Sequence, residues 1–335
     1  SAIVKPQDYF NTKLYTGNAS SSRDITGVGF QPDFTWIKDR DGTFSHILGN
    51  AVSGDNKFLS SNGTAAESTD STKFRTFVSD GFQVGNHNGV NANSNDYASW
   101  NWLAGASQTL NSGNVTSTVR ANTTAGFSIV KWTGTADNIL VSHGLGVIPK
   151  VVMIKNLSNG SAQWVVYHVG TGNTKACYLN TTATPTTASG FFNNFTPDAT
   201  NFIVGSDTAV NGSGNSMIAY CFADVQGYSK FSSYTGNGSA DGSFIYTGFK
   251  PAFVMMKCTD LARSWQMHNN KSDPFNSVTR RLFANLSDAE VSNTDLDFLS
   301  NGFKVRTTDL NMNGSGNNYI YMAFAENPLV ANSGT

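Results

Sequence analysis

The feature that most constrains the fold of this chain is a set of four short motifs that occurs three times along its 335 residues. The first motif is an aromatic residue followed by Thr-Gly. Its three glycines are 117 (134 − 17) and 102 (236 − 134) residues apart. The three copies are Tyr15-Thr16-Gly17, Trp132-Thr133-Gly134 and Tyr234-Thr235-Gly236.

The second motif is a proline that opens an apolar run ending in lysine, and its copies have the same two spacings. Proline fits the first residue of a strand, where the missing N–H is least costly. Each run is therefore expected to be a strand. The three runs are Pro32–Lys38, Pro149–Lys155 and Pro251–Lys257.

Two further motifs complete the set, and the order is the same in each copy. The third motif is a short run around Phe82, Phe202 and Phe303. The fourth is a closing run with apolar residues on both alternating faces, which predicts a central strand or one covered by a loop or neighbouring unit. The closing runs are 95–102, 215–222 and 317–324.

These recurrences predict three tandem units of about 100 residues, since a periodic set of motifs is typical of repeat architectures. The units span 9–105, 126–225 and 228–328, with an N-terminal extension 1–8 and a C-terminal tail 329–335. The Ser/Thr/Asn-rich stretch 106–125 is expected to be a linker, so that unit one stands apart. The short junction Gln226-Gly227 joins units two and three closely. The sequence leaves open whether the units form a threefold ring or a string.

Composition favours strands over helices. Charged residues make up only 13% of the chain, and much of the polarity comes from Gly, Asn, Ser and Thr. Thr and aromatic residues favour strands, while Gly, Asn and Ser favour turns. We expect an all-β fold of three antiparallel β-sandwich, jelly-roll-like units, each with seven to nine short strands. The stretch 279–291 has some helical character, but it aligns with strand-like segments of the other units.

Charge and cysteine content exclude several classes of protein. The net charge of −1 offers no basic excess for phosphates, so we expect no nucleic-acid partner. No apolar run is long enough for a membrane span, and residues 1–8 do not resemble a secretory leader. The three cysteines lack metal-site spacing and are expected to be buried free thiols, consistent with assembly in a reducing cytoplasm.

No pattern of catalytic residues stands out. The five histidines have no metal-binding spacing, and the chain has neither a nucleophile elbow nor a phosphate-binding loop. Asp295-Leu-Asp297 is the best metal candidate, but a solvated strand explains it as well, and Asp39-Arg-Asp41-Gly42 reads as a turn. We therefore predict no catalytic residue, no metal and no cofactor.

Two aromatic-histidine segments are the candidate ligand site. Trp164 and His168 lie in unit two, and Trp265 and His268 occupy similar places in unit three. An indole beside polar groups can hold a sugar ring, whose C–H groups stack on the indole face. The alternative is core packing, because each unit needs a large buried aromatic residue.

The sequence also resembles a family. Segment 219–251, together with Gly29–Lys38, Ser142–Pro149 and Ser300–Phe303, is similar to tandem-repeat virion structural and tail proteins of marine and other tailed bacteriophages. The resemblance runs from Tyr9 to Pro328. It implies a particle component and no catalytic residue. Because the units make up almost the whole chain, it favours a compact appendage, knob or decoration subunit over a long fibre.

Three functions follow from these observations. The leading hypothesis is a non-enzymatic virion structural protein on the tail or capsid that is involved in host-surface attachment. It would be assembled in the host cytoplasm as a homo-oligomer, and its partners would be other virion proteins. The second is a tail-fibre protein that binds a host surface glycan. The third is a polysaccharide-degrading tail enzyme, which would need a pair of carboxylates about 5–10 Å apart.

Overall fold

The structure, a computed structural model, describes residues 3 and 5–326 and is almost entirely β-structure. In the described part of the chain, the three α-helices are single turns and the strands form antiparallel sheets, which confirms the predicted all-β class. No helix among these residues is long and apolar enough to cross a membrane. The expected tail 329–335 lies outside the described residues.

Unit one is a sandwich of two antiparallel sheets. Strands β1-β9-β3-β4 form one sheet, β2-β8-β7 form the other, and β5-β6 is a small hairpin at the side. An apolar cluster that includes Tyr15, Ile37 and Phe82 fills the space between the two sheets. The elements are η1 (Pro6–Asp8), β1 (Phe10–Thr16), β2 (Arg23–Thr26), β3 (Phe34–Asp39), β4 (Ile47–Asn50), β5 (Lys57–Phe58), β6 (Ser68–Thr69), β7 (Phe74–Val78), β8 (Gly81–Val84), α1 (Asn88–Asn91) and β9 (Asp96–Trp102).

Unit two has the same sandwich with an extra hairpin at its edge. One sheet has the order β10-β11-β12-β19-β14-β15-β16-β17, and the pair β13-β18 lies opposite. The elements are β10 (Ser107–Leu110), β11 (Ser117–Asn122), β12 (Phe127–Thr133), β13 (Ile139–Ser142), β14 (Val151–Asn156), β15 (Val165–His168), β16 (Lys175–Tyr178), β17 (Thr186–Thr187), α2 (Ser189–Phe192), β18 (Asn201–Val204), α3 (Thr208–Asn211) and β19 (Ser216–Phe222).

The extra hairpin corrects the expectation of a linker over 106–125. Strands β10 and β11 pair with each other, and β11 pairs with β12 over six residues. Although the stretch is rich in Ser, Thr and Asn, Val119 is fully buried in the core of unit two. The segment is therefore part of the unit two sheet, and unit one does not stand apart behind a flexible connection.

Unit three is a single sheet that curls over to face itself. The order is β20-β27-β22-β23-β24-β25-β26-β21. The stretch 279–291 forms no helix: β24 covers its first part and β25 begins at its end. The elements are β20 (Ser229–Thr235), β21 (Phe244–Tyr246), β22 (Phe253–Cys258), β23 (Gln266–Asn269), β24 (Val278–Phe283), β25 (Val291–Leu299), β26 (Gly302–Val305) and β27 (Asn318–Phe324).

The strand order β1-β9-β3-β4 of unit one recurs as β12-β19-β14-β15 and β20-β27-β22-β23. The register recurs too: β1 begins opposite Trp102, β12 opposite Phe222 and β20 opposite Phe324, each the last residue of a closing strand. Residues that hold the same place in the three units can therefore be compared directly. We call them equivalent below.

The glycine of the first motif has a steric cause. A Cβ atom on Gly134 would lie 2.2 Å from the carbonyl oxygen of Gly212, in the turn before the closing strand. The same backbone approach occurs at Gly17 and Gly236, at 1.9 and 2.4 Å. Only glycine leaves room for this turn to lie against the end of the first strand.

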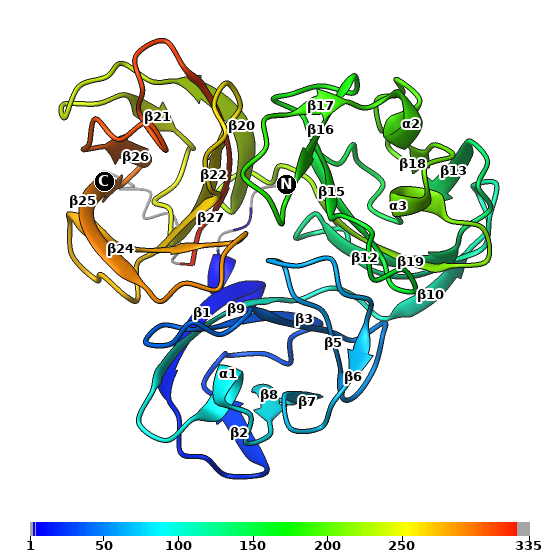
Figure 1. Ribbon diagram of the computed structural model, residues 1–335, viewed down its shortest axis with the longest axis horizontal. Helices are drawn as coiled ribbons and strands as arrows, with labels where there is room; N and C mark the ends of the chain where they lie inside the picture. The colour runs from blue at the N-terminus through cyan, green and yellow to red at the C-terminus, as the bar shows by residue number, and fades with distance from the viewer. Residues whose placement is uncertain (1–2, 4, 327–335) are drawn as a thin grey trace, which may run out of the picture.

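The three units surround a common centre (Figure 1). The last residues of the closing strands, Trp102, Phe222 and Phe324, meet there with ring centroids 5.6–6.2 Å apart. They belong to one buried cluster with members from all three units, which also contains Phe10, Phe34, Phe127 and Phe253. The chain thus forms a threefold ring around a shared aromatic core, one of the two arrangements that the sequence leaves open.

The central core explains why the closing strands are apolar on both faces. In β19, Tyr220 and Phe222 point into the shared core, while Ala219 and Cys221 point into the sandwich of unit two. The three cysteines are buried free thiols, as expected. Burial raises the pKa of Cys177 and of Cys221 to about 12, so both are protonated at neutral pH.

Candidate functional site

The two tryptophans of the expected ligand site lie at the junctions between units. Trp164 is fully buried, and its indole Nε1–H donates to the carbonyl oxygen of Ser60 in unit one at 2.9 Å. Trp265 is equally buried and donates to the carbonyl oxygen of Tyr178 in unit two at 3.0 Å.

His46 holds the equivalent position in unit one. Its Nε2 lies 2.8 Å from the carbonyl oxygen of Phe283 in unit three, and its Nδ1 accepts from Trp36. That arrangement makes Nε2 the protonated nitrogen, and burial lowers the pKa of His46 to about 3. Each unit thus donates one side-chain N–H to an equivalent carbonyl of its neighbour, and the three bonds close a ring.

His168 and His268 are not equivalent, although both follow a tryptophan closely. His168 lies opposite Val151 in the sheet, at the place of Asn50 and Asn269, and its Nε2 contacts the carbonyl oxygen of Tyr321 at 3.1 Å. His268 lies on the other face of its strand, and neither ring nitrogen has a hydrogen-bond partner among the described residues.

The structure therefore corrects the ligand hypothesis for Trp164, His168, Trp265 and His268. All four side chains have at most 1% of their surface exposed. A sugar ring must reach the open face of an indole, but both indoles are packed in the buried cluster that the three units share, where Trp164 stacks on Tyr220. The alternative, core packing, is confirmed by the burial of these residues. The sequence does not reveal that Trp164, His168 and Trp265 also contact carbonyl groups of neighbouring units.

Of the two acidic segments, Asp39-Arg-Asp41-Gly42 forms the expected turn, whereas the solvated strand expected at Asp295-Leu-Asp297 is wrong for Asp295, which is fully buried. Asp295 is buried against Arg281, whereas Asp297 lies 3.5 Å from Arg306, so the two carboxylates have different partners. Asp39 accepts from the N–H groups of Asp41 and Gly42, as a turn requires. In the described ranges, no three His, Cys, Asp or Glu side chains come together as metal ligands.

The lysines that end the proline-led strands are buried, which the sequence alone does not indicate. Lys38, Lys155 and Lys257 are fully covered. The ammonium group of Lys155 donates to the carbonyl oxygens of Asn156 and Asn159 at 2.9 and 3.4 Å. Burial lowers the pKa of Lys38 and of Lys155 to about 8. These lysines close the turn after each strand rather than face a ligand.

Unit three holds a buried charged cluster of its own. Arg281 Nη1 lies 3.4 Å from Asp295 and 3.0 Å from Asp309. Burial raises the pKa of Asp295 to about 7, and one of its oxygens has no partner among the described residues. Solvent does not reach the cluster at Asp295, because this residue is fully buried.

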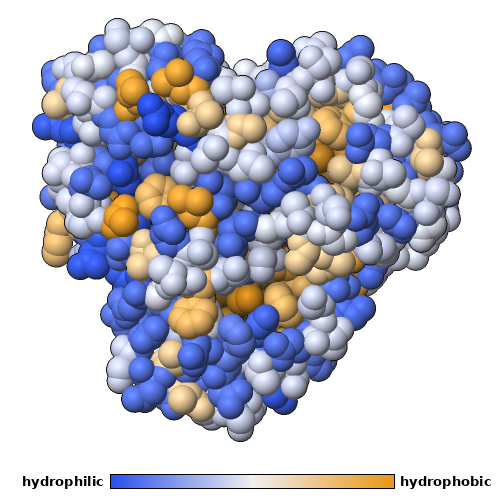
Figure 2. Space-filling model, in the orientation of Figure 1, coloured by the Kyte–Doolittle hydropathy of each residue, from blue (hydrophilic) through white to orange (hydrophobic). Residues whose placement is uncertain are grey.

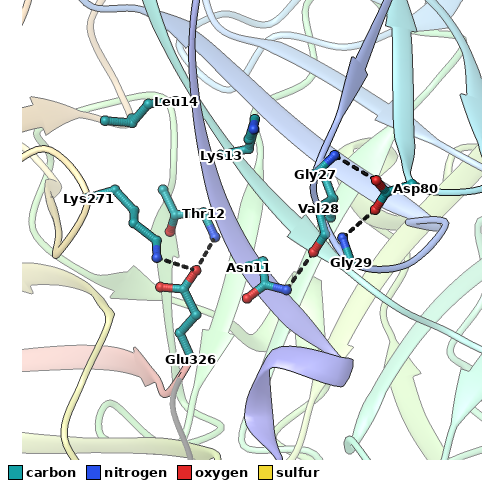
Figure 3. A pocket seen from close by; sticks show the side chains of 10 residues that line it. All are labelled: Asn11, Thr12, Lys13, Leu14, Gly27, Val28, Gly29, Asp80, Lys271 and Glu326. Carbon is teal, nitrogen blue, oxygen red and sulfur yellow. Dashed lines mark hydrogen bonds and ion pairs between the residues drawn. The ribbon is translucent and has the colours of Figure 1, made fainter.

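One hollow lies between β1 and the turn after β2, where unit one meets unit three. Its volume is about 590 Å³, and Figure 3 shows the residues that line it. Asp80 accepts from the N–H groups of Gly27 and Gly29 and so fixes the turn after β2. Asn11 donates to the carbonyl oxygen of Val28 at 2.6 Å. These contacts form the wall of the hollow on the unit one side.

Unit three contributes Glu326 and Lys271 to the opposite wall (Figure 3). Oε1 of Glu326 accepts from the backbone N–H of Thr12 at 3.3 Å and lies 3.3 Å from the ammonium group of Lys271. Burial raises the pKa of this carboxyl group, while Lys271 opposes the rise. Oε2 of Glu326 and the hydroxyl of Thr12 have no partner among the described residues, although both are buried. Buried polar atoms without a partner among the described residues therefore border the open space of this hollow.

Comparison with known proteins adds one family. A family model described as "Domain of unknown function (DUF7483)" matches residues 5–328. A search of curated proteins found no match. The family match covers all three units and assigns no activity to the hollow or to the buried clusters.

Proposed function

This chain belongs to the DUF7483 family, and we propose that it is a non-enzymatic structural component of a tailed bacteriophage particle, built as a compact appendage on the tail or capsid. The phage assignment rests on the sequence resemblance over Tyr9–Pro328. The observation that carries the structural role is the closed ring of three units around one aromatic core. Such a ring resists local opening, because every unit buries part of its surface against the other two.

The chemistry of the described residues supports a non-enzymatic role. Asp295 and Asp309 both contact Arg281, and Asp295 is fully buried. A glycosidase needs two carboxyl groups on either side of an accessible sugar ring. We therefore favour the structural hypothesis over a polysaccharide-degrading enzyme.

Attachment to the host surface fits the exposed loops better than the buried aromatic residues. Figure 2 shows a face on which hydrophilic and neutral residues predominate and hydrophobic patches are small and separate. Loops on a rigid sandwich are common recognition elements. The Asn- and Gly-rich turns before the closing strands, including Asn93 and Asn95, are the loops that we propose for contact with the host.

Purified particles test the proposal. Mass spectrometry should find the chain at a fixed copy number, and a density map of the particle should hold a three-lobed body on its surface. Absence of the chain from intact, infectious particles would overturn the structural role. Release of reducing sugar from host polysaccharide by the pure protein would refute the non-enzymatic assignment.

A further inference from the structure

The side of the sandwich between its two sheets is closed in unit two and open in unit one. In unit two, the hairpin β10–β11 covers the edge of β12 and reaches β13, where Asn114 N–H donates to the carbonyl oxygen of Leu140. Val119 of β11 fills the core there. In unit one no strand among residues 3 and 5–326 is paired to the equivalent edge of β1, and the 590 Å³ hollow occupies the equivalent gap.

Strand β1 offers the backbone groups that a further strand needs. It is the outer strand of its sheet, and its inner edge is paired to β9 over seven residues. The N–H of Thr12 points outward, toward Glu326. Because N–H groups alternate along a strand, that of Leu14 points to the same side. Unpaired strand edges of this kind bind extended peptides by strand addition.

The hairpin also shows which side chains suit such a strand. In β11, Arg120 lies opposite Ile129, and Ile129 is equivalent to Thr12. Arg120 forms a 2.6 Å ion pair with Asp33, a carboxylate of the neighbouring unit. At the β1 edge, the neighbouring unit supplies Glu326 instead, with one buried oxygen unpartnered. A basic side chain opposite Thr12 would face that carboxylate.

From this geometry we propose that the hollow beside β1 binds an extended polypeptide strand of a partner protein, with an aliphatic residue opposite Lys13 and an arginine or lysine opposite Thr12. The strand pairs with the free edge of β1, its aliphatic side chain enters the gap above Val28, and its cation pairs with Glu326. Lys271, whose side chain is 44% exposed, then turns toward solvent.

Strand β20 of unit three has an equivalent edge that is less suited to the same partner. Its hollow measures about 380 Å³. Asp224, equivalent to Glu326, accepts from the N–H of Phe231 at 2.8 Å and already forms a 2.9 Å ion pair with Lys230. Both oxygens of Asp224 are therefore partnered, whereas both contacts of Glu326 fall on Oε1 and leave Oε2 without a partner among the described residues. The proposal therefore commits to β1.

A synthetic peptide with the sequence of residues 114–123, Asn-Val-Thr-Ser-Thr-Val-Arg-Ala-Asn-Thr, is the probe, used with the full chain. Calorimetry should give saturable binding of one peptide per chain, and hydrogen exchange should slow at the Leu14 amide. No saturable binding up to about 1 mM peptide would overturn the proposal. Protection at the Ser233 amide of β20 instead of Leu14 would overturn the choice of β1.

Matched variants separate strand addition from general adhesion. A peptide with glutamate in place of its arginine should bind at least tenfold more weakly, and a scrambled peptide should not bind. In the protein, Glu326→Gln should reduce affinity for the arginine peptide but not for a peptide with alanine in place of its arginine. Asp224→Asn should leave the affinity for each of these two peptides unchanged. Equal affinity of all four peptides for the native chain would contradict the proposed pairing. None of these outcomes depends on the proposed phage function.

Discussion

Truncation of Phe222 tests whether the three units share one core. The ring is 1% exposed, and its centroid lies 6.2 Å from that of Trp102 in unit one and 5.8 Å from that of Phe324 in unit three. Phe→Ala changes in packed cores cost about 3–5 kcal/mol. Contact with rings from all three units leaves little room for the surrounding side chains to collapse, so we expect Phe222→Ala to cost about 4 kcal/mol.

Guanidinium unfolding followed by tryptophan fluorescence measures this loss, because each unit contains at least one tryptophan. We expect a single transition that moves to lower denaturant with an unchanged slope. Phe275→Ala is the control, since that ring is 83% exposed and surface changes stay within about 0.5 kcal/mol. A loss below about 1 kcal/mol, or a new transition confined to unit two, would refute the shared core.

Three further predictions concern the features that define the units. Gly134→Ala should destabilise the fold by about 1–3 kcal/mol through its contact with the Gly212 carbonyl, whereas Gly63→Ala, in open space, should have little effect in the same unfolding assay. Trp265→Phe should cost about 1–3 kcal/mol more than Trp132→Phe, because Trp265 loses its hydrogen bond to the partly buried carbonyl of Tyr178, whereas the indole N–H of Trp132 has no partner among the described residues; equal losses would exclude the ring of inter-unit bonds as a stabilising feature. His168 has a pKa lowered by burial to about 4, so the unfolded chain binds the extra proton between pH 6.5 and 4, and stability falls as the pH drops through that window. His168→Asn, which places there the residue found at the equivalent positions 50 and 269, should flatten this dependence by up to about 1.4 kcal/mol per pH unit in urea titrations; an unchanged slope would contradict a neutral buried His168.

The sequence predicts much of the architecture because its strongest signals are local. Pro32 and Pro149 precede strands, where a missing N–H is tolerated. Gly17 and Gly134 stand where a turn meets the first strand, and a Cβ atom would clash there. The alternating apolar pattern of the closing runs indicates burial on both faces. It does not indicate that the second face packs against other units.

The predictions that are wrong concern segments whose structure depends on residues distant in the sequence. The stretch 106–125 is polar in composition, yet Val119 gains a core position because β12 offers an unpaired edge. Trp164 and Trp265 are of a residue type common in sugar-binding sites, but both are buried at unit junctions, where they hydrogen-bond to a neighbouring unit. Glu326 carries no motif, and its place beside Thr12 follows only from closure of the ring between the first and last units.

The most direct test of the central claim is hydrogen exchange of the intact native protein, resolved by residue on β9, β19 and β27. One strand comes from each unit, and all three end in the shared core. If the ring opens only as a whole, their slowest amides share one opening free energy, equal to that of global unfolding. Opening free energies that differ by more than about 2 kcal/mol between the three strands would show units that unfold separately, and would contradict the account.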